Sequence, residues 1–415
     1  MQILLPVFLL GIVGFYEFPS SKRKIFAIVY CFVLAVVAFS WQPHTADDLF
    51  REYQNLEGIR QYGWKYFSMK ESEYYVATKF DGLYLTQLYY YLFAQLPVNN
   101  FLPAVTTFIV YYLQFSIIEK ISARYELSKL NTFVLYAFVL CTRETYMIMS
   151  GIRNQLAFSV AGYFLYKDLI ENRNKIKCFI VYFLMIFVHQ SAIFIIAFRM
   201  LCLIQSKRIK AICAFVALFW SIGLDTLNSI LSRWDSLPVI RTLLYKINIY
   251  TVDNGGNSAN IILRTRYLIY MLSWIPIVLL LVYTVFYLKR NLPVNSIDKI
   301  RRIRFGKGKL IISRKSRLKD YSDVIIENNE MGWFVLFNAC FTIGSYMYYW
   351  LYLRAASILG IIGVIPITGV LKLYSDRNRV HSKNNYILFV MVMCLIKFLI
   401  TMFYMNRNMD FGFTL

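Results

Sequence analysis

The chain has 415 residues, of which 58% are hydrophobic and only 16% are charged, and its mean hydropathy is +0.50. Average globular proteins carry about 25% charged residues, so this composition excludes a soluble globular protein and indicates a helical membrane protein. The formal net charge of +22 then predicts how the chain is oriented in a membrane, and we expect no nucleic-acid partner.

The distribution of Lys and Arg predicts which side of the membrane each loop faces, because these residues favour the cytoplasmic side. One alternation of sides gathers 29 of the 45 Lys and Arg residues in six inward loops. These loops are residues 21–24, 119–130, 167–177, 206–210, 289–330 and 372–385. The fold predicted from this alternation is an all-α polytopic membrane domain over residues 1–415, with about 12 transmembrane helices (11–13).

The predicted spans follow one another from the first apolar segment, which we expect to be a retained helix, to the last. They cover residues 2–18, 25–41, 101–118, 131–149, 152–167, 178–188, 191–205, 211–225, 266–288, 331–350, 354–371 and 386–405.

The first outer loop, residues 42–100, contains the polar run ADDLFREYQNL directly after a predicted helix end. Its candidate site residues are Asp47, Asp48, Arg51 and Tyr53, with Glu52 in the same cluster. Carboxylates can accept hydrogen bonds from sugar hydroxyls, and aromatic rings can pack on sugar faces, although an interfacial aromatic belt is the simpler interpretation of the rings. Residues 82–96 are too short for a full crossing and predict an interfacial or re-entrant helix.

Arginines inside apolar segments are the most informative residues, because a buried guanidinium is costly and usually faces a cavity or an anion. They are Arg143, Arg153 with the neighbouring Asn154 and Gln155, Arg264, Arg266 and Arg354. The predicted topology places all of them near the outer face, where three or four guanidinium groups would suit a diphosphate. Each could instead extend to the interface or pair with a local acid such as Glu144.

His189 lies between two apolar segments that are too short for two ordinary crossings, so we expect two half-length helices that meet near it. A lone histidine in such a place is often structural. At the predicted depth of the arginines, a neutral imidazole could also accept a proton from a sugar hydroxyl.

Two further loops are long. The outer loop 226–265 contains a Gly-Gly pair that suits either a mobile lid or a plain connector. The inner loop 289–330 carries twelve basic residues, which favours anchoring to anionic lipid headgroups. The seven cysteines show no metal-binding spacing and with three histidines predict no metal site and no cofactor.

The segments SGIRNQLAFSVAGYFLY (150–166) and FVHQSAIFIIAF (187–198), together with the early ADDLFREYQNL, resemble the EpsG-like group of bacterial polysaccharide polymerases, which is akin to the Wzy O-antigen polymerases. The resemblance implies an architecture similar to GT-C glycosyltransferases and an active site on the periplasmic side of the bacterial inner membrane. It also implies that Arg153 contacts the substrate diphosphate, that His189 lies at the catalytic cavity, and that the element around Asp48 faces the sugars.

The function expected from these features is the joining of polyprenyl-diphosphate-linked oligosaccharide repeat units, with release of undecaprenyl diphosphate. Catalytic roles are predicted for His189, Asp48 and Arg153, and the choice between Asp48 and His189 as the base stays open. A lipid-linked oligosaccharide flippase, an O-antigen ligase and a single-sugar glycosyltransferase are the alternatives. Expected partners are the lipid-linked substrate, membrane lipid and a chain-length regulator.

Overall fold

The computed structural model describes residues 3–43, 45, 47–69, 80, 82–223, 229, 232–234, 268–291, 315–346, 348–376 and 379–408, with side chains described outside 234, 315–328 and 403–408. Within these ranges the secondary structure is helical, without strands. In chain order the elements are α1 (Leu4–Glu17), α2 (Ser20–Ser40), α3 (Asp48–Tyr62), η1 (Gly63–Ser68), α4 (Tyr84–Ala94), α5 (Phe101–Arg124), α6 (Lys129–Thr142), α7 (Thr145–Ser150), α8 (Ile152–Leu169), α9 (Lys175–Ile186), η3 (Gln190–Ala192), α10 (Ile193–Leu203), α11 (Lys207–Phe219), η4 (Ser232–Trp234), α15 (Ile275–Asn291), α17 (Lys315–Gly344), α18 (Tyr349–Ile362), α19 (Val364–Asp376) and α20 (Val380–Asn408).

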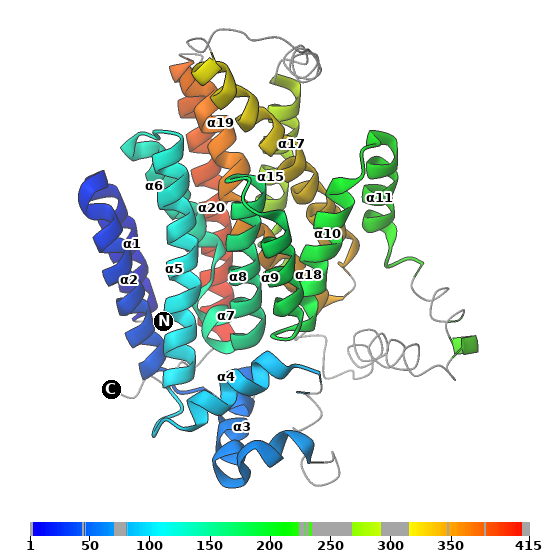
Figure 1. Cartoon of the computed structure of the whole chain (residues 1–415). Helices are drawn as coiled ribbons and strands as arrows, with labels where there is room; N and C mark the ends of the chain where they lie inside the picture. Colours follow the sequence, from blue (N-terminus) through cyan, green and yellow to red (C-terminus); the bar gives the residue numbers. More distant parts are fainter. Residues whose placement is uncertain are drawn as a thin grey trace.

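Each of the twelve predicted spans overlaps a described helix. Five helical segments of the described chain are long and apolar enough to cross a bilayer. They are Ser20–Ser40, Phe101–Arg124, Leu268–Asn291, Tyr349–Asp376 and Val380–Met402. The chain is therefore a helical membrane-embedded protein, and the shorter apolar helices, among them α1 and α6, pack between these segments (Figure 1).

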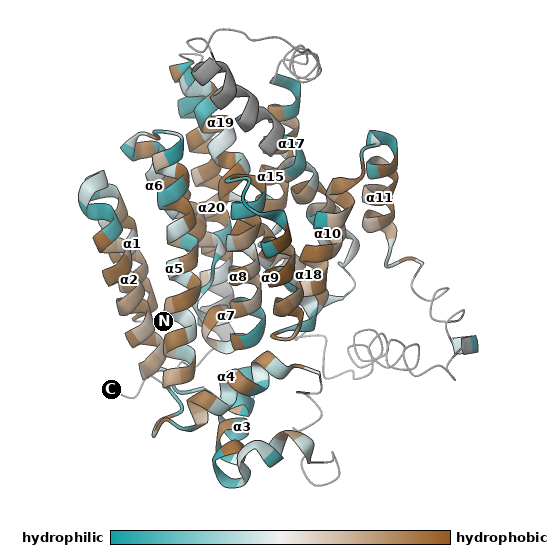
Figure 2. Cartoon of the chain, viewed as in Figure 1, coloured by the Kyte–Doolittle hydropathy of each residue, from teal (hydrophilic) through white to brown (hydrophobic). Residues whose placement is uncertain are grey.

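Burial separates a central segment from peripheral ones. The most apolar window of Tyr349–Asp376 is 94% buried in the molecule, whereas that of Val380–Met402 is 33% buried. A helix that is apolar on all sides is typical of a protein core. In a membrane protein, a helix with an exposed apolar face is expected to contact lipid. Figure 2 shows that apolar residues cover most of the long helices, while polar residues concentrate toward their ends.

The connections whose flanking helix ends are rich in Lys and Arg lie at one end of the bundle. The α1–α2, α5–α6, α8–α9, α10–α11 and α19–α20 connections are together on the upper side in Figure 1. Polar side chains start several helices there: Ser128, Asn174 and Ser206 each accept a hydrogen bond from a backbone N–H of the helix that follows. This grouping agrees with the alternation of sides predicted from the basic residues.

Helices α3 and α4 lie at the opposite end, below the bundle in Figure 1. The guanidinium group of Arg60 in α3 donates hydrogen bonds to the carbonyls of Ala94 and Leu96, at 3.0 and 2.8 Å, and so joins the two helices. Helix α3 ends at Gly63, whose φ of 60° is a conformation that glycine adopts without steric cost.

Several predicted spans differ from the structure. The predicted span 131–149 is broken after Thr142, because Arg143 leaves the helical conformation and α7 begins only at Thr145. Helix α17 begins at Lys315, within the predicted inner loop 289–330, and Tyr349 begins α18 before the predicted 354. Hydropathy locates apolar segments but not helix ends, since a charged turn can extend a helix into water.

Candidate functional site

The first polar cluster joins α3 to the start of α8. Nη2 of Arg153 lies 3.3 Å from Oε1 of Glu52, and both side chains are largely buried, at 12% and 4% exposure. The amide of Asn55 donates to the other carboxylate oxygen of Glu52 at 2.7 Å, and the hydroxyl of Tyr66 donates to Asn55 at 3.0 Å. We call Glu52, Asn55, Tyr66 and Arg153 the Arg153 cluster.

Two polar atoms near these residues in the sequence are buried and have no hydrogen-bond partner among the described residues. They are the hydroxyl of Tyr53 and the amide oxygen of Asn154. Burial raises the pKa of Tyr53, so its hydroxyl stays protonated and can donate. A Cβ at Gly151 would lie 2.6 Å from the Asn154 oxygen, so glycine leaves room for this amide. Buried polar atoms normally find partners, and these two could serve a bound ligand.

Arg143 occupies a second cluster, inside the bundle. Its guanidinium donates to the hydroxyl of Ser357 in α18 at 2.8 Å and to that of Ser159 in α8 at 3.1 Å. The Ser357 hydroxyl in turn lies 3.3 Å from the side-chain oxygen of Gln155. We call Arg143, Gln155, Ser159 and Ser357 the Arg143 cluster.

The Arg143 cluster is unusual because its buried guanidinium has no direct ion-pair partner among the described residues. Arg143 is 2% exposed, and within the described part of the chain it forms no ion pair and its Nε has no hydrogen-bond partner. Neutral serine hydroxyls only partly offset the cost of burying a guanidinium. The cluster therefore keeps a positive charge inside the bundle without a direct counter-ion among the described residues.

Arg143 and Arg153, which the sequence predicts in a single group, lie at different faces of helix α8. Successive residues of a helix are rotated by about 100°, which puts Gln155 and Ser159 on one face of α8 and Arg153 on another. Arg153 thus faces α3, whereas Arg143 faces the α8–α18 contact. These contacts do not support the prediction that both guanidinium groups surround one anion.

Arg354 lies on α18, one turn before Ser357, and is half-buried. Residues three apart on a helix share a face, so Arg354 follows the side of α18 that carries the Arg143 cluster. Arg264 and Arg266 lie outside the described residues.

His189 marks the break between α9 and η3, as predicted from the two short apolar segments. Its Nδ1 accepts a hydrogen bond from the backbone N–H of Ser191 at 3.2 Å, and its ring meets Phe158 of α8 edge-on, at 6.2 Å between centroids. Helix α4 packs on the same break, since the hydroxyl of Thr86 donates to the carbonyl of Val188 at 2.6 Å. The break at His189 and the start of α8 therefore lie at the same end of the bundle (Figure 1).

The remaining predicted residues of the first outer loop have mixed environments. Asp47 accepts a hydrogen bond from the hydroxyl of Tyr146 in α7 at 2.8 Å, which fixes the start of α3 against the bundle. Asp48 and Arg51 pair with each other at the surface, about half exposed. A surface pair of this kind contributes roughly 0–1 kcal/mol to stability, so both groups can exchange partners at little cost.

Two buried ion clusters were not selected from the sequence as site residues. Glu144 pairs with Lys397 of α20 and also accepts from Tyr270. Arg199 of α10 contacts Asp168 of α8 through two nitrogens, at 2.6 and 3.2 Å, and lies 3.1 Å from Glu330 of α17. The signal was present, because ionisable residues within apolar helices are rare and usually have a partner.

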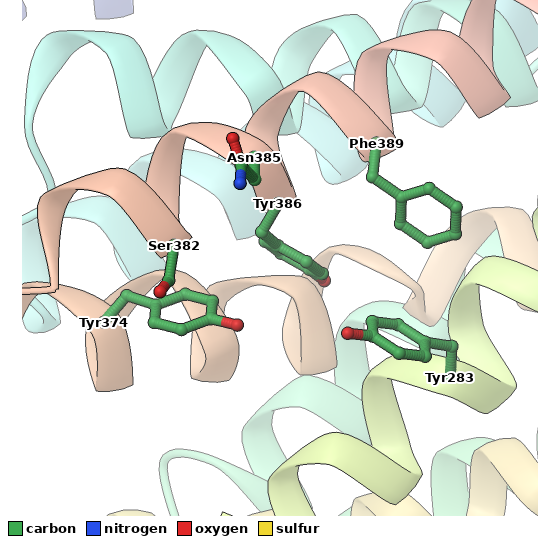
Figure 3. A pocket seen from close by; sticks show the side chains of 6 residues that line it. All are labelled: Tyr283, Tyr374, Ser382, Asn385, Tyr386 and Phe389. Atoms are coloured by element: carbon green, nitrogen blue, oxygen red, sulfur yellow. The ribbon is translucent and has the colours of Figure 1, made fainter.

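Two cavities lined by described residues lie away from both arginine clusters. One of about 450 Å³ opens between α15, α19 and α20 (Figure 3), and another lies along α9. Among the described residues no three His, Cys, Asp or Glu side chains gather as metal ligands would.

Comparison of the chain with protein-family models, with curated proteins and with solved structures found no match.

Proposed function

We propose that this chain is a membrane glycosyltransferase of the polysaccharide-polymerase type. In this proposal it joins polyprenyl-diphosphate-linked oligosaccharide repeat units and releases undecaprenyl diphosphate. Twelve helices cross the bacterial inner membrane, as in GT-C glycosyltransferases. The end with α3 and α4 faces the periplasm, and the end with the basic connections faces the cytoplasm.

The observation that supports the proposal most is the Glu52–Arg153 contact. It joins two of the three segments that carry the polymerase resemblance, and these segments are about 100 residues apart in the chain. The third, around His189, contacts α8 through Phe158. Segments that meet in space at one end of a bundle can share one substrate, whereas unrelated structural motifs need not meet.

In the proposed reaction a hydroxyl of the acceptor repeat unit attacks the anomeric carbon of the growing chain. The bond from that carbon to the diphosphate oxygen breaks, and its electron pair leaves with undecaprenyl diphosphate. Arg153 offsets the charge that develops on the leaving group, and Glu52 positions its guanidinium. Asp48 or His189 takes the acceptor proton.

Arg143 contributes to the proposal in a different way from Arg153. Its buried guanidinium, which forms no direct ion pair among the described residues, contributes positive potential inside the bundle beside Ser159 of α8. Ser159 lies six residues after Arg153 in the same helix, which corresponds to about 9 Å along its axis. At this separation Arg143 attracts the anion electrostatically and does not share a hydrogen-bonded site with Arg153.

The test is an assay of purified protein in detergent with a synthetic lipid-linked repeat unit. A ladder of products is expected for the natural chain. Arg153→Ala should abolish the ladder and leave single repeat units on the lipid, and Arg153→Lys should recover little, because an ammonium group cannot reproduce the planar guanidinium fork. Arg173→Ala is the matched control, since Arg173 is an exposed arginine in the α8–α9 connection.

The outcomes separate the proposal from its alternatives. A normal ladder from Arg153→Ala at normal expression would refute the role of this residue. A single transfer to another acceptor indicates a ligase, and movement of the substrate across vesicles without bond formation indicates a transporter.

A further inference from the structure

The cavity between α15, α19 and α20 has no role in the proposed glycosyl transfer. It is lined by Tyr283, Tyr374, Ser382, Asn385, Tyr386 and Phe389 and has a volume of about 450 Å³. This volume is in the range of about 300–1,000 Å³ that is typical of small-ligand sites. The cavity adjoins the α19–α20 connection, at the end of the bundle opposite to α3 and α4 (Figure 1).

The lining offers hydrogen bonds but no charge of its own. Figure 3 shows that the hydroxyls of Tyr283 and Tyr374 point toward each other across the space between the helices. The hydroxyl of Tyr386 is held at 2.9 Å from that of Thr284. Phenols, a serine hydroxyl and an amide suit the hydroxyl and ester oxygens of a ligand.

Exposed apolar residues lead from the cavity along both helices that flank it. On α15, Leu279, Tyr283 and Phe286 are about half exposed and follow the spacing of one helix face. On α20, Leu388, Val392, Leu395 and Leu399 form a similar exposed stripe. In a membrane protein such stripes face acyl chains, so the cavity opens toward lipid at the end of the bundle.

Positive charge lies at the rim. The backbone N–H of Arg379 donates to the carbonyl of the lining residue Tyr374 at 3.1 Å, and Lys383 lies in the first turn of α20, rotated by about 100° from the lining residue Ser382. Lys372 is paired with Asp376 at 3.0 Å, whereas Arg379 and Lys383 form no ion pair within the described residues. Their charge complements a phosphate group at the membrane surface.

We propose that this cavity binds the headgroup of an anionic phospholipid with hydroxyl groups, of the phosphatidylglycerol type. The phosphate lies beside Arg379 and Lys383, the glycerol oxygens bond to the phenols and to Asn385, and the acyl chains follow the exposed stripes of α15 and α20.

The test is native mass spectrometry of the full chain in detergent with phosphatidylglycerol or phosphatidylcholine of identical acyl chains. The natural chain should bind phosphatidylglycerol at least 10-fold more tightly, because only this lipid offers donor hydroxyls and a net negative charge; one charge-assisted hydrogen bond alone accounts for roughly this factor. Asn385→Leu and Lys383→Gln should each reduce this preference about 5–10-fold.

Asn384→Leu is the matched control, because Asn384 is also exposed on α20 but does not line the cavity. Glycerol 1-phosphate without acyl chains should not displace the lipid. Equal binding of the two lipids, an equal loss in Asn384→Leu, or displacement by glycerol 1-phosphate would each overturn the proposal. Because the assay measures lipid binding alone, its result is independent of the polymerase activity.

Discussion

Arg143 combines deep burial with the lack of an ion-pair partner among the described residues. Evolution rarely keeps such a charge for stability, because desolvation of a cation costs several kcal/mol and serine hydroxyls recover only part of it. A function that needs the charge is the better explanation. In the proposed enzyme this function is electrostatic attraction of the diphosphate. Residues that preorganise a functional site commonly lower the stability of the protein.

Replacing Arg143 with Met should therefore separate stability from activity. Methionine fills a similar volume, and the released hydroxyls of Ser159 and Ser357 can bond to the carbonyls four residues earlier in their own helices. We expect an unchanged or higher free energy of unfolding, by up to about 4 kcal/mol, together with loss of the polymer ladder. Thermal unfolding in detergent and the ladder assay measure the two effects.

A destabilised Arg143→Met protein that still makes polymer would contradict this interpretation. It would assign Arg143 a purely structural role, held by its bonds to α8 and α18.

At this scale the sequence indicated which arginines would be buried better than it predicted their partners. Glu144 was the obvious local partner for Arg143, yet it pairs with Lys397, 253 residues away. Glu52, within the predicted polar cluster, proved to be the partner of Arg153. Partners of this kind depend on how the helices pack. Residue spacing and hydropathy in a single sequence do not predict which helices pack together.

At the scale of elements, α8 is positioned by a close contact with α18. A Cβ at Gly162 would lie 2.3 Å from Cγ2 of Ile361, so the two helices approach more closely than any other residue would permit. This approach brings Ser357 within reach of Gln155 and Arg143. The geometry of the Arg143 cluster therefore depends on a glycine one turn away from Ser159.

Gly162→Ala should push α18 away from α8 and lower the free energy of unfolding by about 1–3 kcal/mol, with a parallel loss of activity. Ile361→Ala removes the atom that would clash, so the double substitution should cost less than the sum of the two single ones. Thermal unfolding of the four proteins completes the cycle.

Gly223→Ala serves as the comparison, because its Cβ would meet only a carbonyl oxygen at an ordinary 3.8 Å. Strict additivity of Gly162→Ala and Ile361→Ala would show that the close approach does not control the cluster.

The breaks between elements were only partly predictable. The interruption at His189 followed from the length of two apolar segments, and the structure confirms it. The interruption at Arg143 was missed, because residues 131–149 are apolar enough to read as one span. Hydropathy is averaged over a window, so it does not detect a break at two adjacent ionisable residues. Here Arg143 bonds to α8 and α18, and Glu144 bonds to α20.

For the whole molecule, the prediction to test is sidedness. The basic connections share one end of the bundle and α3 with α4 occupies the other (Figure 1). Because Lys and Arg favour the cytoplasmic side of a membrane, we expect the end with the basic connections to face the cytoplasm.

Cysteine labelling of intact cells can measure this directly. Ser21→Cys and Ser68→Cys are matched substitutions, because both serines are exposed; Ser21 lies in the first turn of α2, beside the α1–α2 connection, whereas Ser68 ends η1, which packs on α3. A maleimide that cannot cross membranes should label the Ser68→Cys protein in intact cells, and the Ser21→Cys protein only after permeabilisation. The unsubstituted chain reports any reaction of its own cysteines, most of which are buried. The reverse pattern would put the Arg153 cluster on the cytoplasmic side and would remove the basis for a periplasmic polymerase.

Helix α8 is fastened near both of its ends. Arg153 holds it to α3 through Glu52, and Asp168 holds it to α10 through Arg199, which also contacts Glu330 of α17. The two attachments are fifteen residues apart, or about 22 Å along the helix axis. Because tilting α8 would strain at least one of these attachments, its position at the α3 end depends on its contacts with α10 and α17 at the other end.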